Sequence, residues 1–303
     1  MNKVAVLGSI NVDSIFQLNH LPLPGETITV ESKRLSGGGK GANQAIAAAR
    51  SGAKTAFIGK IGNDDHGRLM IECLGKENIN TAQVTVSHQL STGEAYILLD
   101  QQGQNSIIVS SGSNQALSDE DVDRAQNEIV SADFLVTQLE IPECVTVRAF
   151  HYAKRNHVMT ILNPAPAKCA ISLELLTRTD LIVPNETESE QITGIKIKDE
   201  KSLIQSSEKS LKQGVKAVII TLGEKGAFFC TPSEHGLIQA FSVLPVDTTA
   251  AGDTFIGALC ARLRKDFSNL REAIIFANKV SSLTVQKLGA ISSIPTLTEI
   301  QKV

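Results

Sequence analysis

The hydrophobic positions of the chain follow two spacings that take turns along most of its length. Continuous apolar runs predict buried strands, and apolar residues repeated every three or four positions predict helices. The expected strands cover 4–9, 54–62, 132–140, 157–163, 180–185 and 215–223, and the expected helices cover 41–51, 65–78, 142–156, 199–213, 251–265 and 269–287. This alternation predicts an α/β fold in which a mostly parallel sheet is covered by helices on both faces.

Two segments, 13–36 and 93–112, depart from this rhythm because apolar and polar residues alternate in them around turn signals. The stretch AYILLD-QQGQN-SIIVSS within the second segment predicts a β-hairpin. We interpret both segments as a small β lid on a single domain that spans 1–303. The alternative is that they form edge strands of the main sheet.

Composition narrows the class of protein. The 303 residues are 42% hydrophobic and carry a net charge of −3, so one large core is possible and no basic surface indicates nucleic acid. No apolar run approaches the roughly 20 residues of a membrane span, and the start of the chain does not resemble a signal peptide. Five dispersed cysteines without a CxxC pair predict a reduced, cytoplasmic location, and six histidines without HExxH spacing argue against zinc.

The glycine-rich stretch GGGKGAN (37–43) opens the first expected helix. It lacks the order of a P-loop, because Gly41 follows Lys40. Gly37, Gly39 and Ala42 match the dinucleotide fingerprint only formally, since the preceding ESKRLS is no buried strand. The remaining interpretations are a glycine turn that caps the helix and a backbone that closely approaches a polar ligand.

Polar residues follow several of the predicted strands. Asn11 and Asp13 lie in GSINVD after the first strand, and Glu140 ends TQLE. Ligands of open α/β sheets bind at the carboxyl ends of strands, and these side chains suit vicinal hydroxyl groups. They are otherwise ordinary loop residues.

Two further motifs have both a structural and a functional interpretation. In PNETE, Asn185 and Glu188 form either a capping box or part of a magnesium site. In TLGEKGA, Gly223 and Gly226 predict a turn that lies against a base or phosphate, or an ordinary hairpin turn.

The stretch TTAAGDTFIGA (248–258) places small residues and one carboxylate at the start of a helix. The amides of Ala250, Ala251 and Gly252 can form an anion hole for a transferring phosphoryl group, with Asp253 as the general base. The alternative is that Asp253 caps its own helix.

These motifs together resemble the PfkB carbohydrate kinases. GSINVD, LPLPGET, GGGKGANQA, LNPAPA, PNETE, TLGEKG, VDTTAAGDTF and KLGAISSIP occur in the family's order and spacing over essentially the whole chain. The resemblance implies a three-layer α/β/α domain with a β lid that also makes a dimer contact. It implies transfer of a phosphoryl group from ATP to the 5-hydroxyl of D-ribose, with Mg²⁺ and K⁺ as cofactors.

The resemblance also implies site residues, position by position. The sugar would be surrounded by Asn11, Val12, Asp13, Gly39, Lys40, Gly41, Ala42, Asn43 and Glu140, with Asp253 as base beside Ala250, Ala251 and Gly252. ATP would be lined by Asn185, Thr221, Leu222, Gly223, Glu224, Lys225, Gly226, Gly252 and Asn278, and Glu188 would serve magnesium. Potassium would lie near Asp247, Thr249, Thr284, Lys287, Gly289 and Ser293.

The chain departs from the family pattern at a few positions. Ile256 replaces the Asn of the usual GDTFNGA, an insertion around 264–269 offsets Asn278, and Lys40 is an alternative partner for the phosphates. The competing functions are a kinase for another small sugar or nucleoside, such as deoxyribose or fructose, a non-catalytic sugar-binding relative, and a dinucleotide-dependent oxidoreductase.

Overall fold

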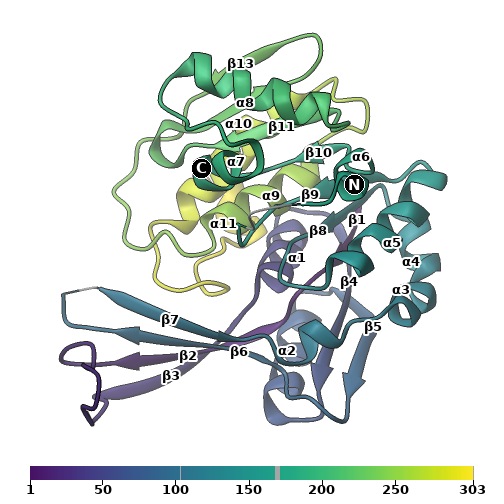
Figure 1. The fold of residues 1–303 in the computed structure, drawn as a ribbon. Coiled ribbons are helices and arrows are strands. Elements are labelled where there is room, and N and C mark those ends of the chain that lie inside the picture. Colours follow the sequence, from purple (N-terminus) through teal and green to yellow (C-terminus); the bar gives the residue numbers. More distant parts are fainter. Residues whose placement is uncertain (103, 168–170, 303) are drawn as a thin grey trace.

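The computed structural model describes residues 1–102, 104–167 and 171–302, so Cys169 lies outside the described residues. A nine-stranded sheet runs through the body in the order β13-β12-β11-β10-β9-β8-β1-β4-β5 (Figure 1). All neighbours pair in parallel except β11 with β12 and β12 with β13. The strands are β1 Lys3–Leu7, β4 Lys54–Gly62, β5 Asn80–Ser87, β8 Phe134–Thr137, β9 Met159–Leu162, β10 Leu181–Ile182, β11 Ala217–Thr221, β12 Ala227–Cys230 and β13 His235–Ile238.

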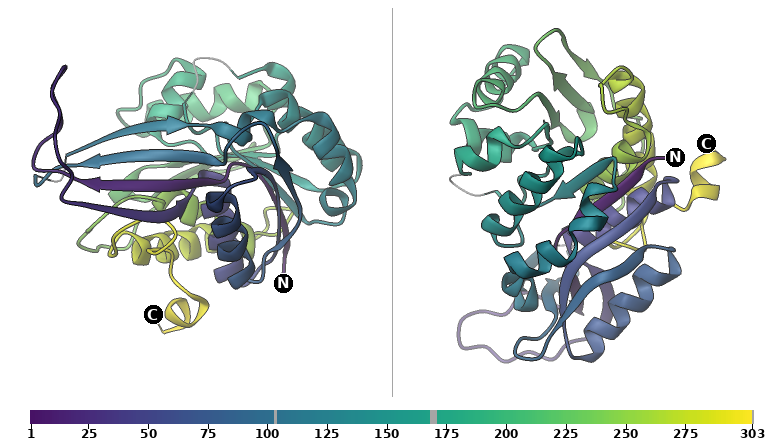
Figure 2. Two further views of the ribbon diagram at one scale, coloured as in Figure 1. Left: turned by 90° about the horizontal axis from the view of Figure 1, so that it is seen from below. Right: turned by 90° about the vertical axis from the view of Figure 1, so that its right-hand side faces the viewer.

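Helices cover both faces of this sheet, which confirms the predicted three layers (Figure 2). One face carries α1 Lys40–Arg50, α2 Asp65–Lys76, α9 Ala251–Arg262, α10 Leu270–Thr284 and α11 Leu297–Gln301. The other carries α3 Asp119–Arg124, α4 Gln126–Val130, α5 Glu143–Arg155, α6 Leu173–Thr177, α7 Glu186–Thr193 and α8 Glu200–Lys212. A search of the described helices finds none that is long and apolar enough to cross a membrane.

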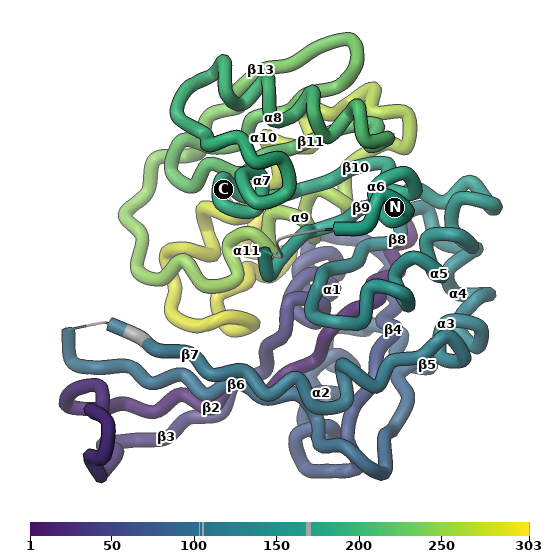
Figure 3. Tube along the Cα trace, viewed as in Figure 1, coloured from purple at the N-terminus to yellow at the C-terminus, as the bar shows by residue number. Residues whose placement is uncertain are grey.

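The two segments set apart by their pattern form a second sheet in the order β3-β2-β6-β7, which projects from the body (Figures 1 and 3). Its strands are β2 Asn11–Gln17, β3 Ser32–Gly38, β6 Gly93–Leu99 and β7 Asn105–Ser110. The pairing of β6 with β7 confirms the predicted hairpin, and the interpretation as edge strands of the main sheet is wrong.

Strand order creates a natural site. From β1 the chain adds β4 and β5 on one side of the sheet and β8 to β11 on the other. The β1–β8 boundary is therefore a topological switch point, where the connections diverge and leave a crevice at the carboxyl ends of the strands. The segments that follow β1 and β8 meet in this crevice.

Candidate active site

The start of α1 is built against the segments that follow β1 and β8. The backbone N–H of Lys40 donates to Glu140 Oε2 at 3.1 Å, and that of Gly41 donates to Ser9 Oγ at 3.2 Å. Ser9 Oγ in turn donates to Glu140 Oε2. The amide end of α1 thus already faces a carboxylate of the protein, which suits the helix dipole. The anion at this helix end is Glu140 itself.

The glycines of GGGKGAN have a structural reason. A Cβ added to Gly41 would lie 2.6 Å from the backbone nitrogen of Ser9, and Gly39 has φ 89°. Only glycine lets the helix begin this close to the β1–β2 connection. The capping-turn interpretation is therefore correct for these glycines, and the side chains of Val12 and Ala42 are buried in the core.

Asn11 and Asp13 lie on β2 where it leaves the body. Asn11 Oδ1 accepts a hydrogen bond from Asn114 Nδ2 at 2.8 Å, and Asn114 also bonds both the N–H and the carbonyl of Ile10. In the part of the chain that the structure describes, no donor reaches the carboxylate of Asp13. Burial, followed by repulsion from Glu140, raises the pKa of Asp13 to about 6.

Asp253 is held by a neighbouring helix. Its Oδ2 accepts from Asn43 Nδ2 at 3.0 Å, and its Oδ1 accepts from Gln44 Nε2 at 2.9 Å. Within the described ranges, no backbone amide of α9 donates to this carboxylate, so the capping alternative is wrong. The residue before the helix, Ala250, has φ 60°, a strained conformation for a residue with a side chain.

Close packing of α1 against α9 makes these hydrogen bonds possible. A Cβ added to Gly257 would lie 2.6 Å from the carbonyl oxygen of Gln44 and 2.5 Å from Ala47 Cβ. The glycine thus allows the two helices to approach until the amides of α1 reach Asp253.

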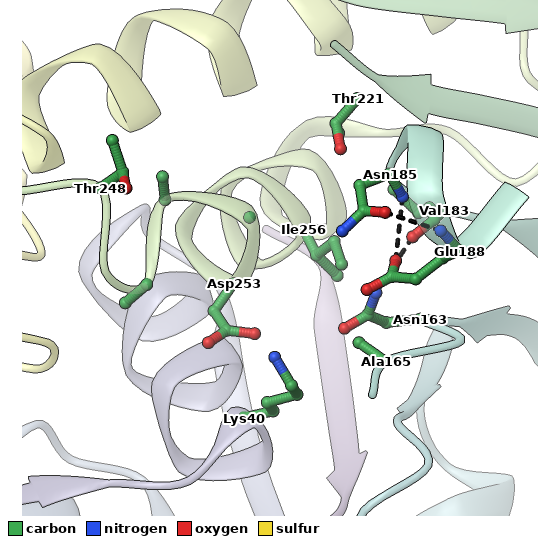
Figure 4. A pocket seen from close by; sticks show the side chains of 13 residues that line it. Lys40, Asn163, Ala165, Val183, Asn185, Glu188, Thr221, Thr248, Asp253 and Ile256 are labelled. Carbon is green, nitrogen blue, oxygen red and sulfur yellow. Dashed lines mark hydrogen bonds between the residues drawn. The ribbon is translucent and has the colours of Figure 1, made fainter. Parts of the chain in front are cut away.

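A pocket lies between the start of α9 and the start of α7 (Figure 4). Lys40 extends into this pocket toward the Asp253 carboxylate. Attraction to Asp253 raises the pKa of the Lys40 ammonium, and Glu140 and Glu188 add to the effect. The ammonium therefore stays charged and partly neutralises this end of the pocket. The pocket also includes Ile256, the Asn163 side chain and the 250–252 backbone.

Asn185 and Glu188 occupy the opposite wall of the same pocket (Figure 4). Glu188 N donates to Asn185 Oδ1 at 2.8 Å and Asn185 N donates to Glu188 Oε2 at 2.9 Å, which confirms the capping box at the start of α7. Burial raises the pKa of Glu188 even though the Asn185 amide lowers it. The cap uses only one of the two carboxylate oxygens.

The segment after β11 has a mixed outcome. Thr221 lines the pocket and bridges to Asn185, whereas 223–225 form an exposed turn between β11 and β12. The hairpin interpretation of TLGEKGA is therefore correct, with Leu222 buried and Gly226 (φ 101°) packed against the carbonyl of Ile238. Asn278 Nδ2 donates to the carbonyls of Ile238 and Gln239 at 3.2 and 3.1 Å.

The two segments predicted to hold potassium do meet. Asp247 Oδ2 accepts from Gly289 N at 2.8 Å, and Asp247 Oδ1 accepts from Thr249 N at 2.9 Å. The Thr284 and Ser293 hydroxyls are buried, bonded to Thr254 Oγ1 and the Ala290 carbonyl. The Lys287 ammonium pairs with Glu299, so only its backbone carbonyl is suited to a cation. The described residues contain no cluster of three or more His, Cys, Asp or Glu side chains placed to hold a metal.

Three polar residues that support this site escaped the sequence analysis: Ser9, Asn114 and Asn163. Ser9 and Asn163 lie inside quoted motifs, but only the fold shows which groups they face. Asn114 lies in the short helix Gly112–Ala116, far from Asn11 in sequence, and no local pattern marks it.

Comparison with known proteins agrees with this geometry. Residues 1–297 match the pfkB family carbohydrate kinases. The chain is 48% identical over 303 residues to the ribokinase of Staphylococcus aureus (strain COL), with 100% of this chain and 99% of that protein covered. It is 49% identical to the bifunctional ribokinase/ribose-5-phosphate isomerase A of Fructilactobacillus sanfranciscensis, where 98% of this chain spans 55% of the longer protein.

A solved structure is similarly close. The Arabidopsis thaliana ribokinase complexed with ribose and ATP superposes with a TM-score of 0.92 at 33% identity, covering 99% of this chain and 98% of that one. The chain belongs to the pfkB family of carbohydrate kinases.

Proposed function

We propose that the protein transfers the γ-phosphoryl group of ATP to the 5-hydroxyl of D-ribose, giving D-ribose 5-phosphate and ADP. The observation that carries this is Asp253, held by two amides at one wall of a pocket whose other wall presents Asn185 and Glu188. Full-length similarity to ribokinases supports ribose as the sugar.

Asp253 would accept the proton of the 5-hydroxyl as its oxygen forms a bond to the γ-phosphorus and the bond to the β-phosphate oxygen breaks. Lys40 supplies positive charge beside this point. The N–H groups of 250–252 at the start of α9 would stabilise the transferring group; those of Ala250 and Gly252 have no acceptor in the described chain, and that of Ala251 donates to the Thr248 carbonyl at 3.2 Å.

The sugar would lie near Asn11, Asp13, Asn43 and Glu140. The Asp13 carboxylate receives no hydrogen bond within the described chain, and Asn43 Oδ1 is buried there without a partner. Both are acceptors suited to sugar hydroxyls. Ribose supplies such donors, and an apolar substrate would leave the acceptors unpaired.

Magnesium and potassium belong to this proposal. The donor set fits magnesium, which usually takes one or two carboxylates and completes its shell with water and phosphates; Glu188 would provide one oxygen. The segments 246–249 and 284–293 fit potassium through backbone carbonyls. The Asp247 carboxylate, already bonded to two amides, would chiefly hold the loops together.

We further propose that the small sheet acts as a lid and as the contact of a homodimer. Its edge strands expose Leu35, Ile107, Ile108 and Val109, an unusual apolar surface for a free sheet. The use of ATP and the four free cysteines among the described residues support a cytoplasmic location. Sedimentation tests the dimer: a fully active monomer would contradict the contact.

The experiment that tests the reaction measures ADP release with Mg²⁺–ATP over ribose, deoxyribose, fructose and adenosine, with and without K⁺. We expect ribose to give the highest kcat/KM and K⁺ to increase the rate. A different sugar at the top of this ranking would replace ribose in the proposal and leave the phosphoryl transfer intact.

A further inference from the structure

The hydrogen bond from Gln44 to Asp253 is one link in a buried network of side-chain amides. Gln44 Nε2 donates both to Asp253 Oδ1 at 2.9 Å and to Asn163 Oδ1 at 3.0 Å. Gln44 Oε1 accepts from Gln138 Nε2 at 2.6 Å. Gln44 and Gln138 are almost fully buried, at 1% and 0% exposure, so water cannot substitute for these bonds.

The network fixes which way the amides of Asn163 and Gln44 point. Asn163 Nδ2 donates to the backbone carbonyl of Val183 at 3.0 Å, and a carbonyl can only accept. Asn163 therefore presents its oxygen to Gln44, so Gln44 must donate from its nitrogen. That same nitrogen faces Asp253, while Gln138 holds the oxygen of Gln44 on the other side. A flipped Gln44 would place its oxygen against two other oxygens.

In a capping box, the carboxylate at the third position of a helix folds back to the backbone N–H of the residue before the helix, as those of Asp121, Glu188 and Glu299 do. Asp253 is the third residue of α9, and its carboxylate instead points to α1. In this orientation the N–H groups of Ala250 and Gly252 have no acceptor in the described chain and remain available to a phosphoryl group, and the carboxylate reaches the neighbouring helix.

We propose that Gln44 is a positioning residue for Asp253. Held by Asn163 and Gln138, it keeps the carboxylate off the amides at the start of α9 and fixes its orientation. Asn43 alone would leave Oδ1 without a fixed partner. The proposal depends on Asp253 as base but is independent of which sugar is the substrate.

The test compares kcat and KM across pH for the wild type, Gln44→Met and Gln44→Glu, using the sugar that the wild type turns over fastest. Methionine keeps the length and removes the donor, whereas glutamate keeps the acceptor for Gln138 and adds a second carboxylate next to Asp253. The charged groups nearest to Asp253 in the pocket, Lys40 and Glu188, are unchanged in every variant.

We expect kcat to fall about 10- to 100-fold in both variants, with KM for sugar and ATP changed by less than about threefold. The acidic limb of the kcat–pH profile should move to higher pH, by about one unit or more in Gln44→Glu, because two adjacent carboxyl groups share a proton. A purely structural role of Gln44 would lower activity without moving this limb.

Two further variants complete the design. Gln138→Met leaves Gln44 in place but frees its oxygen, so it should shift the profile in the same direction by a smaller amount; it also keeps the test open if a Gln44 variant folds poorly. Gln126→Glu makes the same charge change on the exposed surface of α4 and should match the wild type. Profiles of the Gln44 and Gln138 variants that superimpose on the wild-type profile would overturn the proposal. If ribose is not turned over, the ribose assignment fails while this comparison is unaffected.

Discussion

Asp253 and Asp13 are two buried carboxylates near the same crevice, and their surroundings are opposite. They are 7% and 9% exposed. Asp253 receives a side-chain amide on each oxygen, whereas the described residues offer Asp13 no donor. The difference indicates which role each carboxylate can have. A carboxylate whose orientation is already fixed by the protein suits catalysis, and one without a hydrogen-bond donor suits binding of a ligand that supplies the donors.

The largest expected effect is that of Asp253→Asn. The variant keeps the shape of the side chain but has no basic oxygen, so we expect kcat to fall by about 10³-fold or more while sugar binding stays within a few-fold of the wild type. Calorimetry for binding and ADP release for turnover separate the two quantities. Near-normal turnover would mean that Asp253 is not the general base and that its role does not differ from that of Asp13 in the way argued above.

Asp13→Asn should show the reverse pattern, with weaker sugar binding by about 10- to 100-fold and a more stable free protein. The pKa of Asp13 is about 6 in the folded protein, against an ordinary value of 3.8 for an aspartate in water. Ionisation therefore costs stability as the pH rises from about 4 to 6, and the cost is constant above that range.

The size of this cost follows from the shift of roughly two pKa units, about 3 kcal/mol at most. Asp13→Asn should gain up to this amount in free energy of unfolding at pH 7.5 and gain little below pH 4. Urea unfolding at both pH values measures it. An equal gain at the two pH values would mean that the charge of Asp13 is not its source.

Gly257→Ala tests whether the proximity of α1 and α9 maintains the bonds to Asp253. The added methyl group would overlap the carbonyl of Gln44 and Ala47 Cβ, so we expect a loss of about 1–3 kcal/mol in stability and a several-fold fall in kcat. Gly75→Ala in α2 is the matched control, since nothing lies within 4 Å of its added Cβ, and it should stabilise the protein slightly. If kcat in Gly257→Ala equals that of the control, the close packing of α1 against α9 is not what positions Asp253.

The sequence was a better guide to elements than to contacts. The apolar run identified β4 at its observed bounds, 54–62, because a strand buried on both faces is mostly apolar; after Lys54 only Thr55 and Lys60 interrupt the run. The β5 strand, at the edge of the sheet, is only partly buried and lacks that pattern, so it was missed. Asp253 and Glu188 could be suggested from motifs. The donors that decide between cap and base come from α1, more than 200 residues away, and no local pattern encodes that pairing.

Glu188 is intermediate between the two aspartates, because its buried carboxylate accepts a single hydrogen bond, from a backbone N–H. Its substitution has the smallest expected effect. Glu188→Gln retains an oxygen for the Asn185 amide and removes only the charge. We expect the Mg²⁺ concentration for half-maximal rate to rise about three- to tenfold, with stability changed by less than about 1 kcal/mol.

Glu186→Gln, exposed in the same first turn of α7, removes the same charge outside the pocket and should leave the Mg²⁺ dependence unchanged. If both variants respond alike, the effect comes from the general charge at this helix end, and Glu188 is only a helix cap. If only Glu188→Gln responds, the unbonded carboxylate oxygen of Glu188 resembles the carboxylate of Asp13, because both are available to a ligand.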